Sequence, residues 1–364
     1  MVKLRCTACQ RTYALETRKW RCECGGTFEL DGAIPFSLEG IQSSVTTMWR
    51  YRAMLPLSEG AEPVSLGEGL TPLLPVRLYG SQVLCKLEFL APSGSFKDRG
   101  TSVLVSLLAA MGVNEVVEDS SGNAAASLAA YCARAGIDAR IFVPAHASAA
   151  KLAQIAVYGA TVVPVEGPRE NSALAAQEAA ETSYYASHNY NPLFLEGTKT
   201  FAYEAWEQLG RSAPDNVILP LGNGSLLMGT YRGFKDLHAA GLVDRLPKLY
   251  AVQAAACAPF YDAFRRGLDD PQPVTPQETI AEGICIARPS RGGAVLNAIR
   301  ATDGAVVVVD DAEIRSARAV LARAGLYVEP TSATVAAAMV KLNKVIDPQQ
   351  TTVVALTGSG LKSV

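Results

Sequence analysis

Residues 92–100 read Pro-Ser-Gly-Ser-Phe-Lys-Asp-Arg-Gly, and this stretch is the most informative part of the sequence. Its Ser-Gly-Ser part can form a turn and cap a helix, so Lys97 would lie just inside the helix N-terminus. The helix dipole is positive at that end and favours the neutral form of an amine. A neutral lysine can attack an aldehyde, so the segment indicates a Schiff-base lysine. An ordinary surface lysine at a helix start would show the same local pattern.

Three further glycine-containing segments each follow an expected strand. Residues 120–127 read Ser-Ser-Gly-Asn-Ala-Ala-Ala-Ser, residues 221–226 read Leu-Gly-Asn-Gly-Ser-Leu, and residues 356–362 read Leu-Thr-Gly-Ser-Gly-Leu-Lys. The first two also open expected helices, where glycine lets backbone N–H groups approach an anion closely. Each segment alone could be an ordinary helix cap or turn.

Taken in this order, the four segments resemble the fold-type II pyridoxal-phosphate enzymes, and most closely the threonine synthase family. The resemblance extends from about residue 60 to residue 364. It implies a tryptophan synthase β-like α/β fold with two doubly wound parallel-sheet domains. It also implies that Lys97 holds the cofactor aldehyde and then moves protons on the substrate. A homodimer is the usual assembly of this fold.

The same resemblance assigns the remaining cofactor and substrate contacts. Asn123 bonds the phenolic oxygen of the cofactor, and Thr357 faces its pyridine nitrogen. A neutral hydroxyl there makes the ring a weaker electron sink, which suits elimination and replacement chemistry. The cofactor phosphate is cradled by the residues of the second loop: Gly222, Asn223, Gly224, Ser225 and Leu226. The substrate is bound by the residues of the first loop and one lysine: Ser120, Ser121, Gly122, Asn123 and Lys199.

Two positions depart from the family pattern. Residues 191–200 read Asn-Pro-Leu-Phe-Leu-Glu-Gly-Thr-Lys-Thr, so Phe194 stands where the family has an arginine for the substrate phosphate. A phenyl ring cannot replace a bidentate charged partner. Ala124 stands where the family often has Thr or Ser. Other residues could compensate by binding a polar group: Lys151, Lys199, Arg288, Arg291, and the run Ser187-His188-Asn189.

The first 32 residues form a separate segment rich in cysteine. Cys6 and Cys9 make one short pair, Cys22 and Cys24 make another, and twelve residues separate the pairs. Four thiolates at such spacing bind Zn²⁺ tetrahedrally, and so short a segment could hardly fold without a staple. We expect a structural zinc ribbon without a catalytic role. Four free cysteines, or a ribbon without metal, are the alternatives.

Composition and pattern indicate a globular enzyme of more than one domain. The chain has 364 residues, 49% of them hydrophobic, and a formal net charge of −2, which argues against nucleic acid as a partner. We expect no signal peptide, no membrane span and no appended regulatory domain, hence a cytoplasmic protein. Strands and helices alternate from about residue 80, as in parallel sheets covered by helices. The expected domains are 1–32, then 33–90 with 200–364, and 91–199.

Three functions are consistent with these observations. In the first, O-phosphohomoserine and water give threonine and phosphate, a carbon–oxygen lyase reaction of amino-acid biosynthesis in which Lys97 removes the α and β protons. In the second, suggested by Phe194, a related enzyme performs β-replacement or β-elimination on another amino acid, like cysteate synthase or threonine/serine dehydratase. The third is a zinc-ribbon regulator with an inactive pyridoxal fold, against which the intact Lys97 and Asn123 argue.

Overall fold

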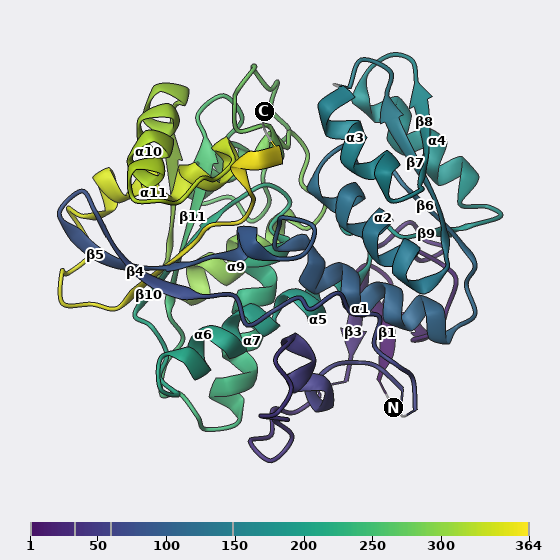
Figure 1. Cartoon of the computed structure of the whole chain (residues 1–364), viewed down its shortest axis with the longest axis horizontal. Coiled ribbons are helices and arrows are strands. Elements are labelled where there is room, and N and C mark those ends of the chain that lie inside the picture. Colours follow the sequence, from purple (N-terminus) through teal and green to yellow (C-terminus); the bar gives the residue numbers. More distant parts are fainter. Residues whose placement is uncertain (1, 33, 59, 148, 363–364) are drawn as a thin grey trace. The chain divides into compact units, whose positions relative to one another are not determined.

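The structure is a computed structural model that describes residues 2–32, 34–58, 60–147 and 149–362, with only the backbone for 149–151. The chain divides into two compact units, shown in Figure 1 with their elements labelled. The first comprises Met1–Glu68 with Lys97–Thr198, and the second comprises Gly69–Phe96 with Lys199–Val364. This division places 33–68 in the first unit, whereas the prediction from sequence groups 33–90 with the larger domain. The three-domain description stays a prediction.

The first unit contains a four-stranded parallel sheet in the order β8-β7-β6-β9. Its strands are β6 (Glu115–Glu118), β7 (Asp138–Pro144), β8 (Thr161–Val165) and β9 (Tyr184–Tyr185). Its helices are α1 (Lys97–Ala110), α2 (Asn123–Ala135), α3 (Ala149–Val157), α4 (Arg169–Ala179) and α5 (Pro192–Thr198). Val116 joins a core with α1 and α2, while its neighbour Val117 packs with Ala176 of α4. Since successive strand residues point to opposite faces, helices cover both faces of this sheet.

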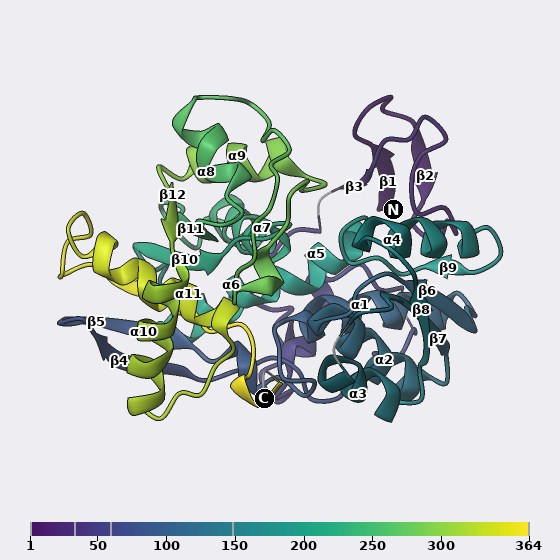
Figure 2. The ribbon, with the colours of Figure 1, turned by 90° about the horizontal axis from the view of Figure 1, so that it is seen from above.

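The N-terminal segment of the first unit is a small antiparallel sheet in the order β2-β1-β3, coloured purple in Figure 2. Its strands are β1 (Lys3–Cys6), β2 (Thr12–Ala14) and β3 (Phe28–Asp31), and a 3₁₀ segment, η1 (Met48–Met54), follows later in the chain. Four buried side chains make its core: Leu4, Cys6, Cys22 and Phe28. So small a core is consistent with the need for a further constraint.

The second unit contains a six-stranded sheet in the order β12-β11-β10-β13-β5-β4. Its strands are β4 (Leu73–Leu78), β5 (Ser81–Lys86), β10 (Asn216–Pro220), β11 (Lys248–Ala254), β12 (Ala305–Val309) and β13 (Thr352–Ala355). All neighbours are parallel except the β4–β5 pair, which is antiparallel at the sheet edge. Short 3₁₀ turns lie outside the sheet: η2 (Glu88–Leu90), η3 (Glu282–Ile284) and η4 (Gly360–Lys362).

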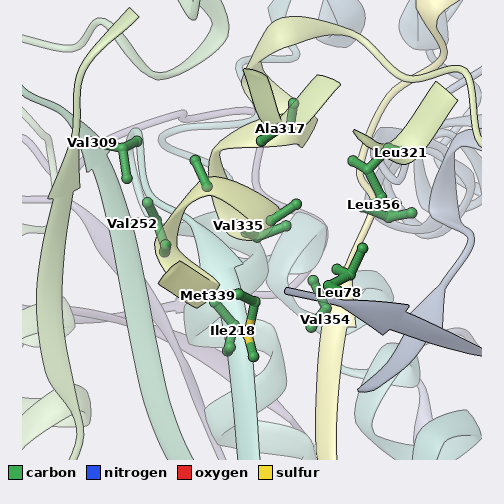
Figure 3. Close-up of a cluster of buried hydrophobic side chains, with 14 of the residues drawn as sticks. Leu78, Ile218, Val252, Val309, Ala317, Leu321, Val335, Met339, Val354 and Leu356 are labelled. Carbon is green, nitrogen blue, oxygen red and sulfur yellow. The ribbon is translucent and has the colours of Figure 1, made fainter. Parts of the chain in front are cut away.

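Helices pack on this larger sheet through an extensive apolar core. The helices are α6 (Thr200–Gln208), α7 (Ser225–Ala239), α8 (Pro259–Arg265), α9 (Gly292–Ala301), α10 (Asp311–Arg323) and α11 (Pro330–Leu342). Figure 3 shows Val335 and Met339 of α11 among Ile218, Val252 and Val354 of the strands. Helices α7 and α9 also contact β11. A core of this size holds the carboxyl ends of β10 and β13 in place, where two of the glycine loops begin.

The alternation of strands and helices in parallel sheets confirms the α/β prediction. The sequence pattern predicts a helix over 123–135 and a strand over 161–165, and these match α2 and β8 residue for residue. The sequence pattern of about 255–304 is the least regular of the chain and predicts a long connection, whereas the structure has helices α8 and α9 there. Within the described residues, no helix combines the length and the apolar character needed to cross a membrane.

Candidate cofactor and substrate site

In the second unit, the loop from Leu221 to Gly224 connects β10 to the N-terminus of α7. Gly224 caps the helix with φ +84°, a conformation that favours glycine, and a Cβ there would lie 2.5 Å from Val295 Cγ2. The loop is further held by the Asn223 Oδ1 atom, which accepts a hydrogen bond from the Ser290 N–H at 3.4 Å. The first turn of a helix has N–H groups without helical acceptors. This loop is therefore suited to bind a phosphate group.

Thr357 lies on the neighbouring strand end, because β13 pairs with β10 and both run in the same direction. Its side chain is buried, and among the described residues its Oγ1 atom has no hydrogen-bond partner. The backbone is fixed: Thr357 N–H donates to Ser332 Oγ at 2.7 Å, and the Thr357 carbonyl accepts from Phe96 N–H at 3.0 Å. A buried hydroxyl without a hydrogen-bond partner is unfavourable unless a ligand supplies that partner. A pyridine nitrogen is a fitting acceptor for it.

In the first unit, Lys97 is the first residue of α1 and is partly buried. Its Nζ atom lies 5.5 Å from the centre of the Phe194 ring. The loop of residues 120–122 follows β6, and Asn123 begins α2. Ser120 Oγ accepts from Gly122 N–H at 3.3 Å, which closes the loop. The carboxyl ends of parallel strands are where α/β proteins bind ligands, so the loop occupies a suitable position.

A buried acid–base pair lies at the same sheet edge. Glu118 ends β6, and its Oε1 atom lies 3.0 Å from Nδ1 of His188, which follows the neighbouring strand β9. Burial raises the pKa of Glu118 well above its usual range, with the charge of Asp119 as the next cause. Burial, followed by the charge of Lys97, lowers the pKa of His188. Both shifts favour the uncharged forms, a protonated Glu118 beside a neutral His188.

The position of this proton determines what His188 can offer a ligand. If Glu118 holds it, Nδ1 accepts and the neutral ring carries its own hydrogen on Nε2. If His188 holds it, both ring nitrogens carry hydrogens. In both of these states Nε2 is a hydrogen-bond donor, whereas loss of the proton from the pair would let Nδ1–H donate to the carboxylate and make Nε2 an acceptor. The sequence pattern predicts His188 as a polar contact but does not single out Glu118. Its position at the end of a strand, just before the Ser-Gly-Asn loop, is the signal that could have found it.

Phe194 is packed as part of the core around the lysine helix. It is 1% exposed, and a Cβ on Gly100 of α1 would come within 2.5 Å of its ring. The His188 ring meets it edge-on at 5.6 Å. Phe194 therefore forms an apolar wall between His188 and Lys97 and offers no charge to a phosphate.

The other cations named from the sequence differ in their surroundings. Lys199 is 3% exposed, and its Nζ lies 3.1 Å from Asp236 Oδ2. Its predicted role as a substrate ligand stays a prediction that this buried ion pair argues against. Arg288 is exposed and Arg291 is buried. The Lys151 side chain lies outside the described residues.

The four N-terminal cysteines come together as a cluster. Their Sγ atoms all lie within 4.8 Å of one another, and the Cys6–Cys24 and Cys9–Cys22 distances are both 3.5 Å. Four sulfurs about 2.3 Å from one zinc ion would be spaced by about 3.8 Å, so the geometry fits. A hydrogen bond from the Tyr13 hydroxyl, 3.1 Å from Cys22 Sγ, lowers the pKa of that thiol to about 6. A Cβ on Gly26 would lie 2.6 Å from Cys6 Sγ, so this turn needs glycine.

Comparison with known proteins agrees with these features. Residues 64–358 match the family described as pyridoxal-phosphate dependent enzyme. The threonine synthase of Methanocaldococcus jannaschii is 38% identical over 377 residues, covering 98% of this chain and 92% of that protein. The threonine synthase of Methanosarcina acetivorans is 34% identical, covering 100% of this chain and 92% of that protein.

Solved structures share the fold. A threonine deaminase from T.th. superimposes with a TM-score of 0.69 at 28% identity, over 79% of this chain and 92% of that one. The predicted fold-type II α/β architecture and the resemblance drawn from the four motifs are thereby confirmed. This chain belongs to the threonine synthase family of pyridoxal-phosphate dependent enzymes.

Proposed function

We propose that this chain is a lyase that converts O-phosphohomoserine and water to threonine and phosphate. The observation that carries the proposal is the similarity to threonine synthases over nearly the whole length of both chains. The match to the pyridoxal-phosphate family and the unpartnered Thr357 hydroxyl support the cofactor. The intact catalytic segments argue against a zinc-ribbon regulator with an inactive fold.

The residues would divide the work as follows. Pyridoxal phosphate, when bound, supplies an electron sink for a carbanion next to the amino group. Lys97 would hold the cofactor and carry protons from and to the substrate α and β carbons. The Thr357 hydroxyl would face the pyridine nitrogen, and Asn123 the phenolic oxygen. Backbone N–H groups of residues 222–226 would hold the cofactor phosphate, and those of residues 120–123 the substrate carboxylate.

The leaving phosphate needs a donor other than the family arginine. We propose His188 for this role, because Glu118 orients its ring and Nε2 carries a hydrogen in both forms of the neutral pair. The Ser187 Oγ atom next to it is buried and has no hydrogen-bond partner within the described residues, so it could also donate. Two neutral donors would bind an anionic oxygen more weakly than a guanidinium would.

A substrate comparison tests the function. Phosphate release is measured with O-phosphohomoserine and with O-phosphoserine, and oxoacid formation with serine and threonine. We expect turnover of O-phosphohomoserine to be fastest. Preference for serine or threonine would instead establish the second candidate, a β-elimination enzyme, which Phe194 and the similarity to a threonine deaminase favour.

The cofactor is tested separately by absorption. The wild-type chain with pyridoxal phosphate should show a band near the visible edge that Lys97→Ala abolishes. A general base in the transition state is worth about 10²- to 10⁴-fold, so turnover should fall at least that far. A wild-type chain that never acquires the band would refute the cofactor assignment.

The proposal also covers the metal of the N-terminal ribbon, the oligomeric state of the chain and its location in the cell. We propose that Cys6, Cys9, Cys22 and Cys24 hold a structural zinc ion, that the chain forms a homodimer, and that it works in the cytoplasm. Metal analysis of a Cys6→Ser/Cys24→Ser variant tests the first point, since unchanged zinc content would exclude these ligands. Sedimentation equilibrium tests the second.

A further inference from the structure

Trp20 of the ribbon contacts the α/β part of the first unit, in addition to Leu30 of β3, which packs in a cluster with Leu193 of α5. Trp20 lies two residues before Cys22, and its ring meets Tyr185 at 5.0 Å and 86° and Tyr190 at 4.9 Å and 74°. The Arg21 guanidinium lies 4.4 Å from the Trp20 ring centre. Figure 2 shows the ribbon strands near β9 and α4, the elements that this contact joins. Edge-to-face aromatic pairs have a defined geometry, so Trp20 can fix the orientation of both tyrosines. We call Trp20, Tyr185 and Tyr190 the aromatic clamp.

The clamp contacts a short segment, residues 186–191, at its start and near its end. Tyr185 precedes the segment, is buried, and donates from its hydroxyl to Asp119 Oδ1 at 2.7 Å. Tyr190 is inside the segment. Within it, Ala186 N–H donates to Val117 O at 2.9 Å, and Asn191 N–H donates to Ser187 O at 3.0 Å. The segment is thus a tight turn whose placement depends on contacts to the sheet and to the ribbon.

This turn places His188 next to Glu118 and Phe194, and Phe194 lies beside Lys97. His188 is 3.0 Å from Glu118, its ring is 5.6 Å from Phe194, and that ring is 5.5 Å from Lys97 Nζ. Trp20 is therefore linked to Lys97 in two stages: the backbone of the turn connects Tyr185 and Tyr190 to His188, and the His188 ring packs on Phe194 beside Lys97. All of these residues lie in the first unit.

We infer that Trp20 is a positioning residue for the reaction, acting through the aromatic clamp on His188. The ribbon then serves the site by fixing this turn, although its cysteines take no part in the chemistry. The inference rests on the proposed function for its kinetic readout and on packing alone for its structural readout. If Trp20 only joined two parts of the fold, removing it would lower stability without changing the turn.

Three variants of the full-length chain loaded with pyridoxal phosphate test this inference. Trp20→Ala removes the ring, Trp20→Phe keeps an aromatic edge, and Lys19→Ala is the matched control on the exposed side of the same loop. Zinc content, kcat and KM for O-phosphohomoserine, and amide hydrogen exchange of residues 186–191 are measured for each. We expect Trp20→Ala to retain zinc and to speed exchange of the turn.

The expected kinetic effect follows from the cost of misplacing a ligand group. Trp20→Ala should lower kcat/KM by about 10- to 100-fold, because a displaced His188 would donate a weaker hydrogen bond to the substrate phosphate. The change should appear mainly in KM. Trp20→Phe should restore most of the loss, and Lys19→Ala should match the wild type. Unchanged exchange and unchanged KM in a zinc-loaded Trp20→Ala chain would overturn the inference, as would equal losses in Lys19→Ala.

A second variant covers the case in which Trp20→Ala does not fold. Tyr190→Ala opens the clamp from the other side and leaves the ribbon sequence intact, so exchange of residues 17–21 should become faster. Unchanged exchange there contradicts the inference. If the wild-type chain releases no phosphate from O-phosphohomoserine, the proposed function fails, while the two exchange measurements still decide whether the clamp orders the turn.

Discussion

A single buried hydroxyl gives the sharpest test of cofactor fit at the residue scale. Thr357→Val keeps the side-chain shape and removes an Oγ1 atom that has no partner among the described residues. The cofactor-free chain should keep its free energy of unfolding or gain slightly, because no hydrogen bond is lost. Affinity for pyridoxal phosphate should fall about 2- to 10-fold, the value of one hydrogen bond of about 0.5–1.5 kcal/mol. Denaturant unfolding and an absorption titration measure the two quantities.

The matched control is another buried threonine of the same unit. Thr334 Oγ1 donates to Thr331 O at 2.7 Å, so Thr334→Val should lower the free energy of unfolding by about 1 kcal/mol and leave cofactor affinity unchanged. Equal cofactor affinity in Thr357→Val and the wild type would contradict the assigned role.

The Glu118–His188 pair predicts a pH profile of stability. The folded pKa of Glu118 is raised above the usual 4.5, and that of His188 is lowered below the usual 6.5. The raised pKa of Glu118 makes stability fall as the pH rises from 4.5 to its folded pKa, whereas the lowered pKa of His188 makes stability rise with pH up to 6.5, so the two slopes oppose each other where they overlap. Above pH 6.5 only the Glu118 contribution remains, and stability should fall by up to about 1.4 kcal/mol per pH unit until Glu118 ionises.

Glu118→Gln separates this contribution from other titrations. Without the acid, only His188 remains, and its lowered folded pKa makes stability rise up to pH 6.5 and stay level above it. Urea unfolding of both chains at several pH values between about 5 and 9 measures the difference. Glu115→Gln, a half-exposed change on the same strand, should keep the wild-type fall. The same alkaline fall in Glu118→Gln would show that another group causes it.

At the scale of elements, the crossing of α1 and α5 places the lysine. A Cβ on Gly197 of α5 would lie 2.0 Å from the Arg99 carbonyl oxygen of α1, two residues after Lys97. Gly197→Ala must push the helices apart, so we expect a loss of about 1–3 kcal/mol or more in stability and weaker cofactor binding. Gly122→Ala is the stability control, since no atom lies within 4 Å of its Cβ position. Wild-type stability in Gly197→Ala would contradict the close crossing.

At the scale of the whole molecule, cofactor binding should stabilise the chain by mass action. Pyridoxal phosphate at about 100 times its dissociation constant should add about 2.7 kcal/mol to the free energy of unfolding. The proposed contacts include Asn123 and residues 222–226, so amide exchange should slow at both segments. Thermal unfolding and hydrogen exchange with and without cofactor measure this. Protection confined to one of the two segments would refute the contacts assigned to the other.

Local chemistry explains which parts were predictable. The boundaries of α2 and β8 follow from turn residues and apolar spacing at those positions. The cofactor was predicted because the four glycine segments, in this order, resemble those of a known family, which the family match confirms. Helices α5, α6, α8 and α9 were not predicted. The first of these contains Gly197, a poor helix former at a position where a Cβ would clash with the backbone of α1.

The sequence by itself predicted the α/β class from the alternation of strands and helices, and the cofactor from the resemblance of four short segments to a known family, while Lys97 as the residue that holds the cofactor stays a prediction. Only the tertiary structure decided what surrounds the position of the missing arginine. In the structure His188 lies within hydrogen-bond distance of Glu118, seventy residues earlier in the chain, and the Phe194 ring packs beside Lys97. Trp20 of the ribbon contacts the rings of Tyr185 and Tyr190. Such pairings arise because neighbouring parallel strands end at one sheet edge, a proximity that no local pattern records.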